Sequence, residues 1–165
     1  MCEKYLPLQP NKGELGYIPQ SLGLVRHASV MHNVMLGANA GHKRFWTPFP
    51  SNTAKKHALD AIIAMGLETY QYNIIRKLSG GQQRRVATAR TLAQQPRLIL
   101  ADEFLSELDD DTKEIVQSKV IEYIHKNKSA LVVVEHDISR AKQMGDRILL
   151  IKDGKMKEIN DSEEE

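Results

Sequence analysis

The stretch Leu98-Ile99-Leu100-Ala101-Asp102-Glu103 decides the fold, because four apolar residues are followed at once by two acids. An apolar run without polar alternation is typical of a strand that is buried on both faces of a parallel sheet. Ligands bind beyond the carboxyl ends of such strands in open α/β sheets, so Asp102 and Glu103 stand where a site is expected. An ordinary strand that runs into an acidic turn explains the same residues equally well.

Two further apolar runs, Leu131–Val134 and Ile148–Ile151, predict strands of the same buried parallel kind. Helices are expected between the strands. Thr112–Asn127 places apolar residues along one broad face, and Gln82–Gln95 is rich in Arg and Ala and stops before Pro96. Strand and helix therefore alternate, which predicts an α/β fold with a parallel sheet and helices on both faces.

The rest of the chain carries fewer signals of structure. Asp153-Gly154 predicts a hairpin turn after the last of the apolar runs. Gly16–Pro19 is typical of a strand end, whereas Ala28–Leu36 and Thr53–Met65 have the spacing of helices. We interpret residues 27–79 as a helical insertion between the first strand and the rest of the sheet.

Composition and charge exclude several classes of protein. The chain has 165 residues, 41% hydrophobic and 27% charged, which is ordinary for one globular domain. A net charge of +2 is too small to argue for nucleic acid or an anionic membrane surface as partner. The single cysteine, Cys2, fits a reducing compartment. No run approaches the roughly 20 apolar residues of a membrane span, and no signal peptide is evident. We therefore expect a cytoplasmic protein.

The stretch Leu78-Ser79-Gly80-Gly81-Gln82 opens one of the predicted helices. A capping box explains Ser79 and Gln82, which are three residues apart. It does not explain the two glycines, since each costs about 1 kcal/mol relative to Ala inside a helix. Two glycines in a first turn indicate a close approach to the backbone. The N–H groups and the positive end of a helix suit a terminal phosphate, which is the interpretation we favour.

These residues resemble the motifs of the ABC ATPase family. Leu78–Gln82 resembles the signature motif of that family without alteration, and the family pattern continues at Arg85, Ala87, Ala89 and Arg90. At the distance expected from it, Leu98–Glu103 resembles the Walker B strand with its catalytic glutamate. Phe104 stands where the family usually has a proline, which should alter the turn and leave both acids in place.

Three further segments resemble motifs of the same family, in the order that the family has them. Gly16–Gln20 resembles the Q-loop, with Gln20 as its glutamine. Ser106–Asp109 resembles the D-loop and departs from its commonest form at Glu107. Glu135-His136-Asp137 resembles the switch-histidine loop that follows a buried strand. Five motifs in order over residues 16–157 leave little room for coincidence.

The resemblance implies a role for each of these residues in binding and hydrolysing ATP with Mg²⁺. It makes Asp102 a Mg²⁺ ligand, Glu103 the general base and His136 a contact to the γ-phosphate. Gln20 would sense Mg²⁺ and the attacking water. The resemblance also implies further residues that bind nucleotide, in part the nucleotide of a second cassette. These are Ser79, Gly80, Gly81, Gln82 and Asp109.

One motif of the family, the P-loop G-x-x-x-x-G-K-[ST], is not found in this sequence. The nearest match begins at Gly37, but its second glycine, Gly41, comes one residue too early and it follows a helical pattern. The family places the P-loop upstream of the Q-loop, where only Met1–Leu15 stand. We therefore expect the C-terminal portion of a cassette that is inactive alone. A truncated product, a misassigned start, a split gene and a designed fragment all fit.

The resemblance divides the chain as one partial ABC domain with a P-loop-NTPase-like sheet. The expected parts are the Q-loop strand region 1–26, the helical subdomain and signature helix 27–95, the core with the remaining motifs 96–160 and a solvated acidic tail 161–165. The family docks its helical subdomain on membrane-spanning partners.

The function implied is the ATP-hydrolysing subunit of a transporter. Its partners would be a transmembrane permease and a second, head-to-tail cassette, at the inner face of the cell membrane, with no nucleic acid. Within transporters, the Gln20–Ala38 stretch and the Phe45-Trp46 insert resemble phosphonate-type importers, and the Leu98–Glu103 region also suits lipoprotein-release exporters. A non-transport ABC ATPase of DNA repair or translation is an alternative, which lacks support from any coiled-coil arm or basic surface. The second alternative is a non-catalytic remnant of such a cassette.

Overall fold

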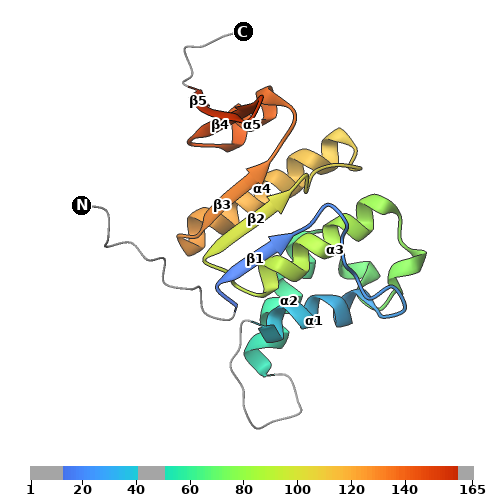
Figure 1. Ribbon diagram of the computed structural model, residues 1–165. Helices are drawn as coiled ribbons and strands as arrows, with labels where there is room; N and C mark the ends of the chain where they lie inside the picture. Colours follow the sequence, from blue (N-terminus) through green and yellow to red (C-terminus); the bar gives the residue numbers. More distant parts are fainter. Residues whose placement is uncertain (1–12, 41–50, 160–165) are drawn as a thin grey trace. The chain divides into compact units, whose positions relative to one another are not determined.

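A three-stranded parallel sheet forms the centre of the fold (Figure 1). The computed structural model describes residues 13–40 and 51–159, and the chain forms two compact units, Met1–Val133 and Val134–Glu165. The strands are β1 (Leu15–Ile18), β2 (Leu98–Asp102) and β3 (Ala130–Val134), with β2 in the middle. The α/β class with a parallel sheet is therefore confirmed.

The pairing of β1 with β2 brings distant parts of the sequence to one edge of the sheet. Tyr17 is opposite Leu100 and Ile18 is opposite Ala101 in a parallel register. Both strands therefore end at the same level. The residues that follow them, which include the predicted site residues Gln20 and Glu103, start from neighbouring positions.

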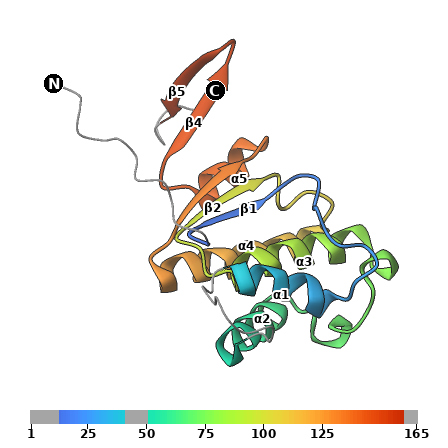
Figure 2. The same ribbon diagram turned by 60° about the horizontal axis from the view of Figure 1, so that its bottom comes forward.

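Four α-helices accompany this sheet in residues 13–40 and 51–133. They are α1 (Val30–Ala40), α2 (Asn52–Ala64), α3 (Gly80–Ala93) and α4 (Asp110–Asn127), with 3-10 turns at Glu68–Tyr70 and Ile75–Lys77. Figure 2 shows α3 and α4 under the same face of the sheet, with α1 and α2 beyond α3. The helices predicted at these places are confirmed, with ends that shift by a few residues.

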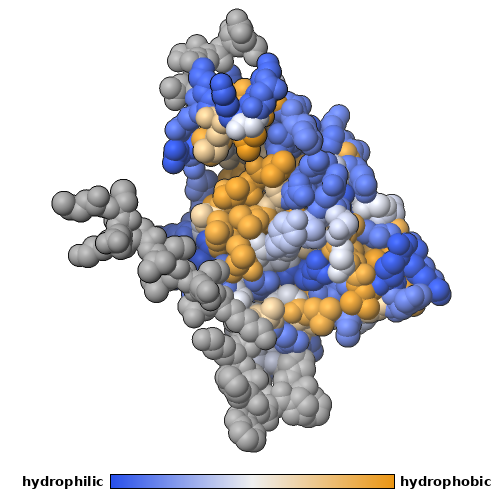
Figure 3. Space-filling model, viewed as in Figure 1, coloured by the Kyte–Doolittle hydropathy of each residue, from blue (hydrophilic) through white to orange (hydrophobic). Residues whose placement is uncertain are grey.

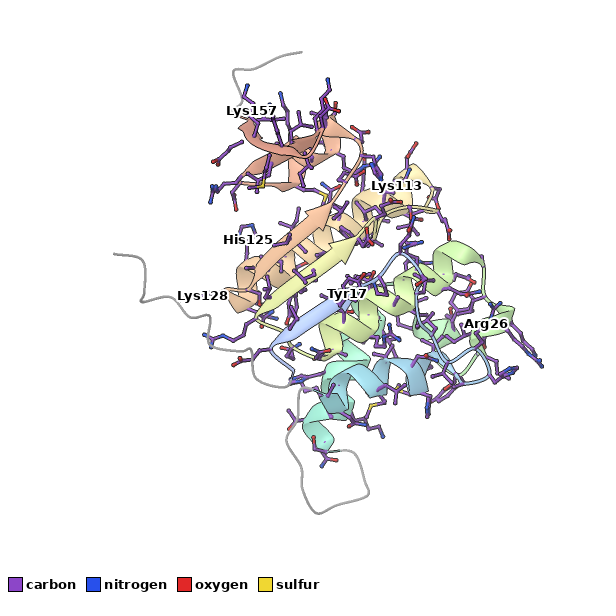
Figure 4. The ribbon with its side chains drawn as sticks, viewed as in Figure 1. Tyr17, Arg26, Lys113, His125, Lys128 and Lys157 are labelled. Carbon is purple, nitrogen blue, oxygen red and sulfur yellow. The ribbon has the colours of Figure 1, made fainter. Side chains whose placement is uncertain are left out.

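The other face of the sheet is open within the first unit. Ile18 and Ile99 point toward the helices and are buried, whereas the residues that alternate with them are apolar and are exposed on β1 and half-buried on β2. This open face consists of Leu15, Tyr17, Leu98, Leu100, Ala130 and Val132. Figure 3 shows apolar residues gathered over the strands, and Figure 4 shows Tyr17 on β1 there. Within the described residues of the first unit, helices therefore cover one face of the sheet, although its strands have the composition of fully buried ones.

Two glycines allow α3 to lie close to its neighbours. A Cβ on Gly37 of α1 would collide with the backbone oxygen of Arg90, and one on Gly16 would lie 2.7 Å from Cγ2 of Thr91. The helices α1 and α3 therefore meet backbone to backbone at Gly37. This glycine serves helix packing, in agreement with our rejection of a P-loop there; residues 41–44 of that match lie outside the described residues.

Three arginine side chains of α3 donate hydrogen bonds to backbone carbonyls of the loops around this helix. Arg85 donates to the carbonyls of Met65 and Gly66, and Arg90 donates to those of Leu22 and Gly23. The third, Arg84, points to the edge of the sheet where the predicted site residues lie. Helix α3 thus organises the connections of the first unit.

The second unit contains α5 (Ile138–Met144) and a hairpin of β4 (Ile148–Lys152) with β5 (Lys155–Ile159). The predicted turn is confirmed, since Asp153 and Gly154 both have positive φ, as a tight hairpin turn requires. The prediction of a buried parallel strand at Ile148–Ile151 is wrong. This strand pairs antiparallel with β5 in a separate sheet, and Ile151 is 73% exposed. A short apolar run does not reveal its partner.

Within residues 13–40 and 51–159, no helix has the length and apolar character needed to cross a membrane. The predicted acidic tail, 161–165, lies outside the described residues.

Candidate functional site

The structure brings Gln20 and Glu103 into direct contact. Gln20 follows β1 and Glu103 follows β2, and the side-chain Nε2 of Gln20 donates to Oε2 of Glu103 at 3.2 Å. The two residues are 83 positions apart in the sequence. Their contact depends on the parallel register of β1 and β2, which ends both strands at one edge.

The two acids lie at the end of β2 in different backbone conformations. Asp102 is the last residue of the strand, while Glu103 has a φ of +48°. Positive φ is uncommon for a residue with a side chain and is found most often at tight turns and functional sites. The turn is closed by a hydrogen bond from the N–H of Ser106 to the Glu103 carbonyl, 3.0 Å. Phe104, in place of the usual proline, is buried beneath this turn.

Arg84 is a residue of this site that the sequence reasoning missed. Its guanidinium donates to the carbonyl of Glu103 at 3.4 Å and to the carbonyl of Gln20 at 3.3 Å. The side chain is only 2% exposed. The sequence carries no clear signal for it, because Thr88 and Thr91, which are in helical step with Arg84 and buried in the structure, are polar residues.

The predicted capping box opens helix α3. The hydroxyl of Ser79 accepts from the N–H of Gln82 at 3.2 Å, and the N–H of Ser79 donates to Oε1 of Gln82 at 3.0 Å. The glycines have a close neighbour within the chain. A Cβ on Gly80 would lie 3.2 Å from Oε2 of Glu107, and one on Gly81 would lie 3.4 Å from the oxygen of Glu107. Packing against the segment after Glu103 therefore accounts for part of the glycine signal that we assigned to phosphate.

Asp109 begins helix α4 as its N-cap. Its carboxylate accepts a hydrogen bond from the N–H of Thr112 at 3.0 Å, and this bond lowers the pKa of Asp109 below its ordinary value. Capping is thus the role that the geometry gives to Asp109. Its part in nucleotide binding stays a prediction.

The loop with His136 belongs to the second unit. Glu135 accepts from the N–H groups of His136 at 3.0 Å and Asp137 at 3.2 Å, and Asp137 then caps α5 through the N–H of Arg140. Because the Glu135 carboxylate accepts from two successive N–H groups, it fixes the backbone conformation at His136. The phosphate contact of His136 stays a prediction.

The residues at the carboxyl edge suit a Mg²⁺ that is shared with a phosphate. In the described part of the chain, no three His, Cys, Asp or Glu side chains cluster as a metal site. Mg²⁺ is commonly held by one or two carboxylates, with phosphate and water oxygens as the remaining ligands. Asp102 supplies such a carboxylate, and Gln20 follows the neighbouring strand end.

Comparisons with known proteins agree with this geometry. The family model described as ABC transporter matches residues 5–106. The Phosphonates import ATP-binding protein PhnC of Escherichia coli O157:H7 is 35% identical over 150 residues, which are 89% of this chain and 57% of the relative. Its counterpart in Escherichia coli strain UTI89 is 33% identical over the same shares.

The solved structures point to the same family. A dimeric, post-hydrolysis structure of the ATP-binding cassette MJ0796 with ADP and Pi has a TM-score of 0.77 at 30% identity, covering 89% of this chain and 63% of the cassette. A second dimeric structure of MJ0796, a bacterial ABC transporter cassette, has a TM-score of 0.74 over the same shares. This chain thus spans less than two thirds of the length of these proteins. The family model, the relatives and the fold all lead to one assignment: the chain belongs to the ABC transporter family.

Proposed function

We propose that this chain supplies the hydrolytic edge and the signature helix of an ATP-hydrolysing transport cassette. The observation that carries the proposal is the hydrogen bond between Gln20 and Glu103 beside Asp102. An acid with a polar neighbour at the carboxyl edge of a parallel sheet can orient and deprotonate a water. Phosphoryl transfer depends chiefly on positioning and on charge stabilisation, which such an edge can provide.

The proposed roles follow from the chemistry of each group. Glu103 accepts the proton of the attacking water, and Gln20 holds that carboxylate through its amide. Asp102 is the carboxylate for Mg²⁺, which supplies charge neutralisation at the phosphates when it is bound. His136 is proposed as a γ-phosphate contact on the resemblance of its loop to the switch-histidine loop. Affinity for ATP must come largely from a P-loop, which the 165 residues do not contain.

The signature helix is proposed to serve the nucleotide of a second cassette. The first turn of α3, from Ser79 to Gln82, presents backbone N–H groups at the positive end of a helix, which favours an anion. Asp109 begins the next helix beside the segment that packs on these glycines. The dimeric form of the related MJ0796 cassettes supports a partner of this kind.

We further propose that the complete protein drives import of phosphonates through a transmembrane permease at the inner face of the membrane. The names of the curated relatives, which are phosphonate importers, support this substrate class. The helical region from α1 to α3 is the candidate surface for the permease.

The test is a completed cassette. The segment of the Escherichia coli O157:H7 relative that precedes the matched region is joined upstream of this chain, and phosphate release from Mg-ATP is measured. Turnover that requires both parts supports the proposal. A folded chimera that binds Mg-ATP and never hydrolyses it would leave only a nucleotide-binding role.

A further inference from the structure

A buried arginine lies behind the contact between Gln20 and Glu103. One guanidinium nitrogen of Arg84 donates to the Glu103 carbonyl at 3.4 Å and another donates to the Gln20 carbonyl at 3.3 Å. The same side chain therefore touches the backbone of both residues whose side chains meet at 3.2 Å. One planar group therefore bridges the two segments that follow β1 and β2.

The charge of Arg84 has a partner on the turn that follows Glu103. Oε1 of Glu107 lies 3.7 Å from the guanidinium, and Glu107 itself has a φ of +64°. Its side chain is 62% exposed, so the ion pair contributes little stability by itself. A buried charge is nevertheless costly without a counter-charge and hydrogen bonds. The carboxylate of Glu107 supplies this counter-charge and so favours the buried position of the Arg84 guanidinium.

We propose that Arg84 is a positioning residue that holds Gln20 and Glu103 at their working distance, with Glu107 as its counter-charge. The guanidinium is suited to this because its donors are fixed in one plane, which neither lysine nor glutamine reproduces. Arg84 stands one turn after Gly80 in α3, so it also ties the signature helix to the turn that carries Glu103. Its effect on catalysis rests on the proposed function, whereas its effect on the Gln20–Glu103 distance does not.

Arg85 provides a matched control from the next position of the same helix. It also donates to two backbone carbonyls, those of Met65 at 2.9 Å and Gly66 at 3.3 Å. Like Arg84, it has a buried Nε without a hydrogen-bond partner among the described residues. Arg85→Gln therefore removes an equivalent set of hydrogen bonds to backbone carbonyls, at a distance from the carboxyl edge of the sheet. This variant shows the effect of losing an arginine that has only a structural role.

The first experiment follows the side-chain amide of Gln20 by NMR in the nucleotide-free 165-residue chain, at a concentration where the chain is a single species. The readout is the shift of this resonance caused by Glu103→Gln. We expect Arg84→Gln to reduce that shift by at least half and Arg85→Gln to leave it unchanged. Glu107→Gln keeps the arginine and should give a smaller reduction. An undiminished shift in Arg84→Gln, or in Glu107→Gln if Arg84→Gln fails to fold, overturns the proposal.

The second experiment measures ATP hydrolysis in the completed cassette. Arg84→Gln should lower kcat about tenfold or more and leave KM for ATP within about twofold, because misplacing a catalytic group slows chemistry more than binding. Arg85→Gln should leave kcat within about twofold. An active cassette in which Arg84→Gln keeps full kcat overturns the proposal. A cassette without any turnover refutes the proposed function, and the NMR shift alone then decides on Arg84.

Discussion

At the scale of single residues, the site depends on backbone placement more than on unusual side chains. Glu103 is held in a left-handed turn, and its contact with Gln20 follows from where two strands end. The sequence predicted both residues, because a strand that ends in acids and a Pro-Gln after a strand can be recognised. It did not predict Arg84, since an arginine in a helix rich in Arg and Gln is expected to face solvent.

Glu103→Gln in the completed cassette should lower turnover by about 10² to 10⁴ and leave ATP binding nearly unchanged, since glutamine keeps the shape and cannot accept the proton. Phosphate release and calorimetric titration check the two halves of this expectation. Glu114→Gln, on the exposed surface of α4, is the matched control and should keep full turnover. Equal rates for both variants would remove Glu103 as the base.

Tyr123 makes the stability of the folded chain depend on pH above 10. Burial raises the pKa of Tyr123 to about 12, from an ordinary 10.0, and its hydroxyl donates to the Pro96 carbonyl at 3.2 Å. The folded chain then holds a proton that the unfolded chain releases, so this stabilisation is complete below pH 10 and is lost as pH rises toward 12.

Urea unfolding between pH 9 and pH 12 checks this, with the native chain compared against Tyr123→Phe. The phenylalanine variant should lose less stability over the window between the two pKa values. Tyr72→Phe, at an exposed position, should follow the native curve. Parallel curves for all three proteins would show that Tyr123 is ionised equally in both states.

At the scale of elements, local signals predicted α3, the hairpin and the Leu98–Asp102 strand well. Capping at Ser79 and the turn at Asp153-Gly154 are properties of neighbouring residues, which a sequence displays directly. The same turn implied an antiparallel partner for Ile148–Lys152, but nothing in the sequence showed that this strand stands outside the parallel sheet. An apolar run by itself predicts a strand with apolar side chains. It carries no information on whether the neighbouring strand runs parallel or antiparallel to it.

Gly37→Ala tests the close contact between α1 and α3. Alanine should gain up to about 1 kcal/mol of helix propensity. The added Cβ collides with the backbone oxygen of Arg90, and such overpacking typically costs about 1–3 kcal/mol. Because backbone moves less easily than a side chain, we expect net destabilisation, measured as a lower urea midpoint.

Asn39→Ala is the control for this effect in the same helix. Asn39 is exposed, so alanine there changes helix propensity without a collision and should leave stability equal or slightly higher. If Gly37→Ala raised the midpoint as Asn39→Ala does, α1 and α3 would not be in backbone contact.

At the scale of the whole molecule, the open face of the sheet is the feature that stands apart. Parallel strands are ordinarily covered on both sides, and these strands are apolar on the side that the first unit leaves exposed. Apolar patches of this kind are typical of surfaces that bind another protein or segment. We therefore expect the 165-residue chain to associate with itself at about tens of micromolar.

Light scattering with a charge placed on the open face tests this. Val132→Lys should reduce self-association, because the new charge lies in the face that copies bury. Ile115→Lys on α4 adds the same charge at a residue of nearly the same exposure, 56% against 55%, and should change nothing. Association that persists equally in both variants would place the contact elsewhere.

The open face also has a consequence for the life of this chain in a cell. Chaperones and proteases continuously sort unfolded protein in cells, and a change in stability of about 1–2 kcal/mol alters abundance several-fold. A chain that presents Tyr17 and Val132 to solvent is a substrate for that sorting until something covers them. The steady-state amount of the chain in a cell should therefore rise when a segment that covers the open face is co-expressed. It should fall when that segment is withdrawn.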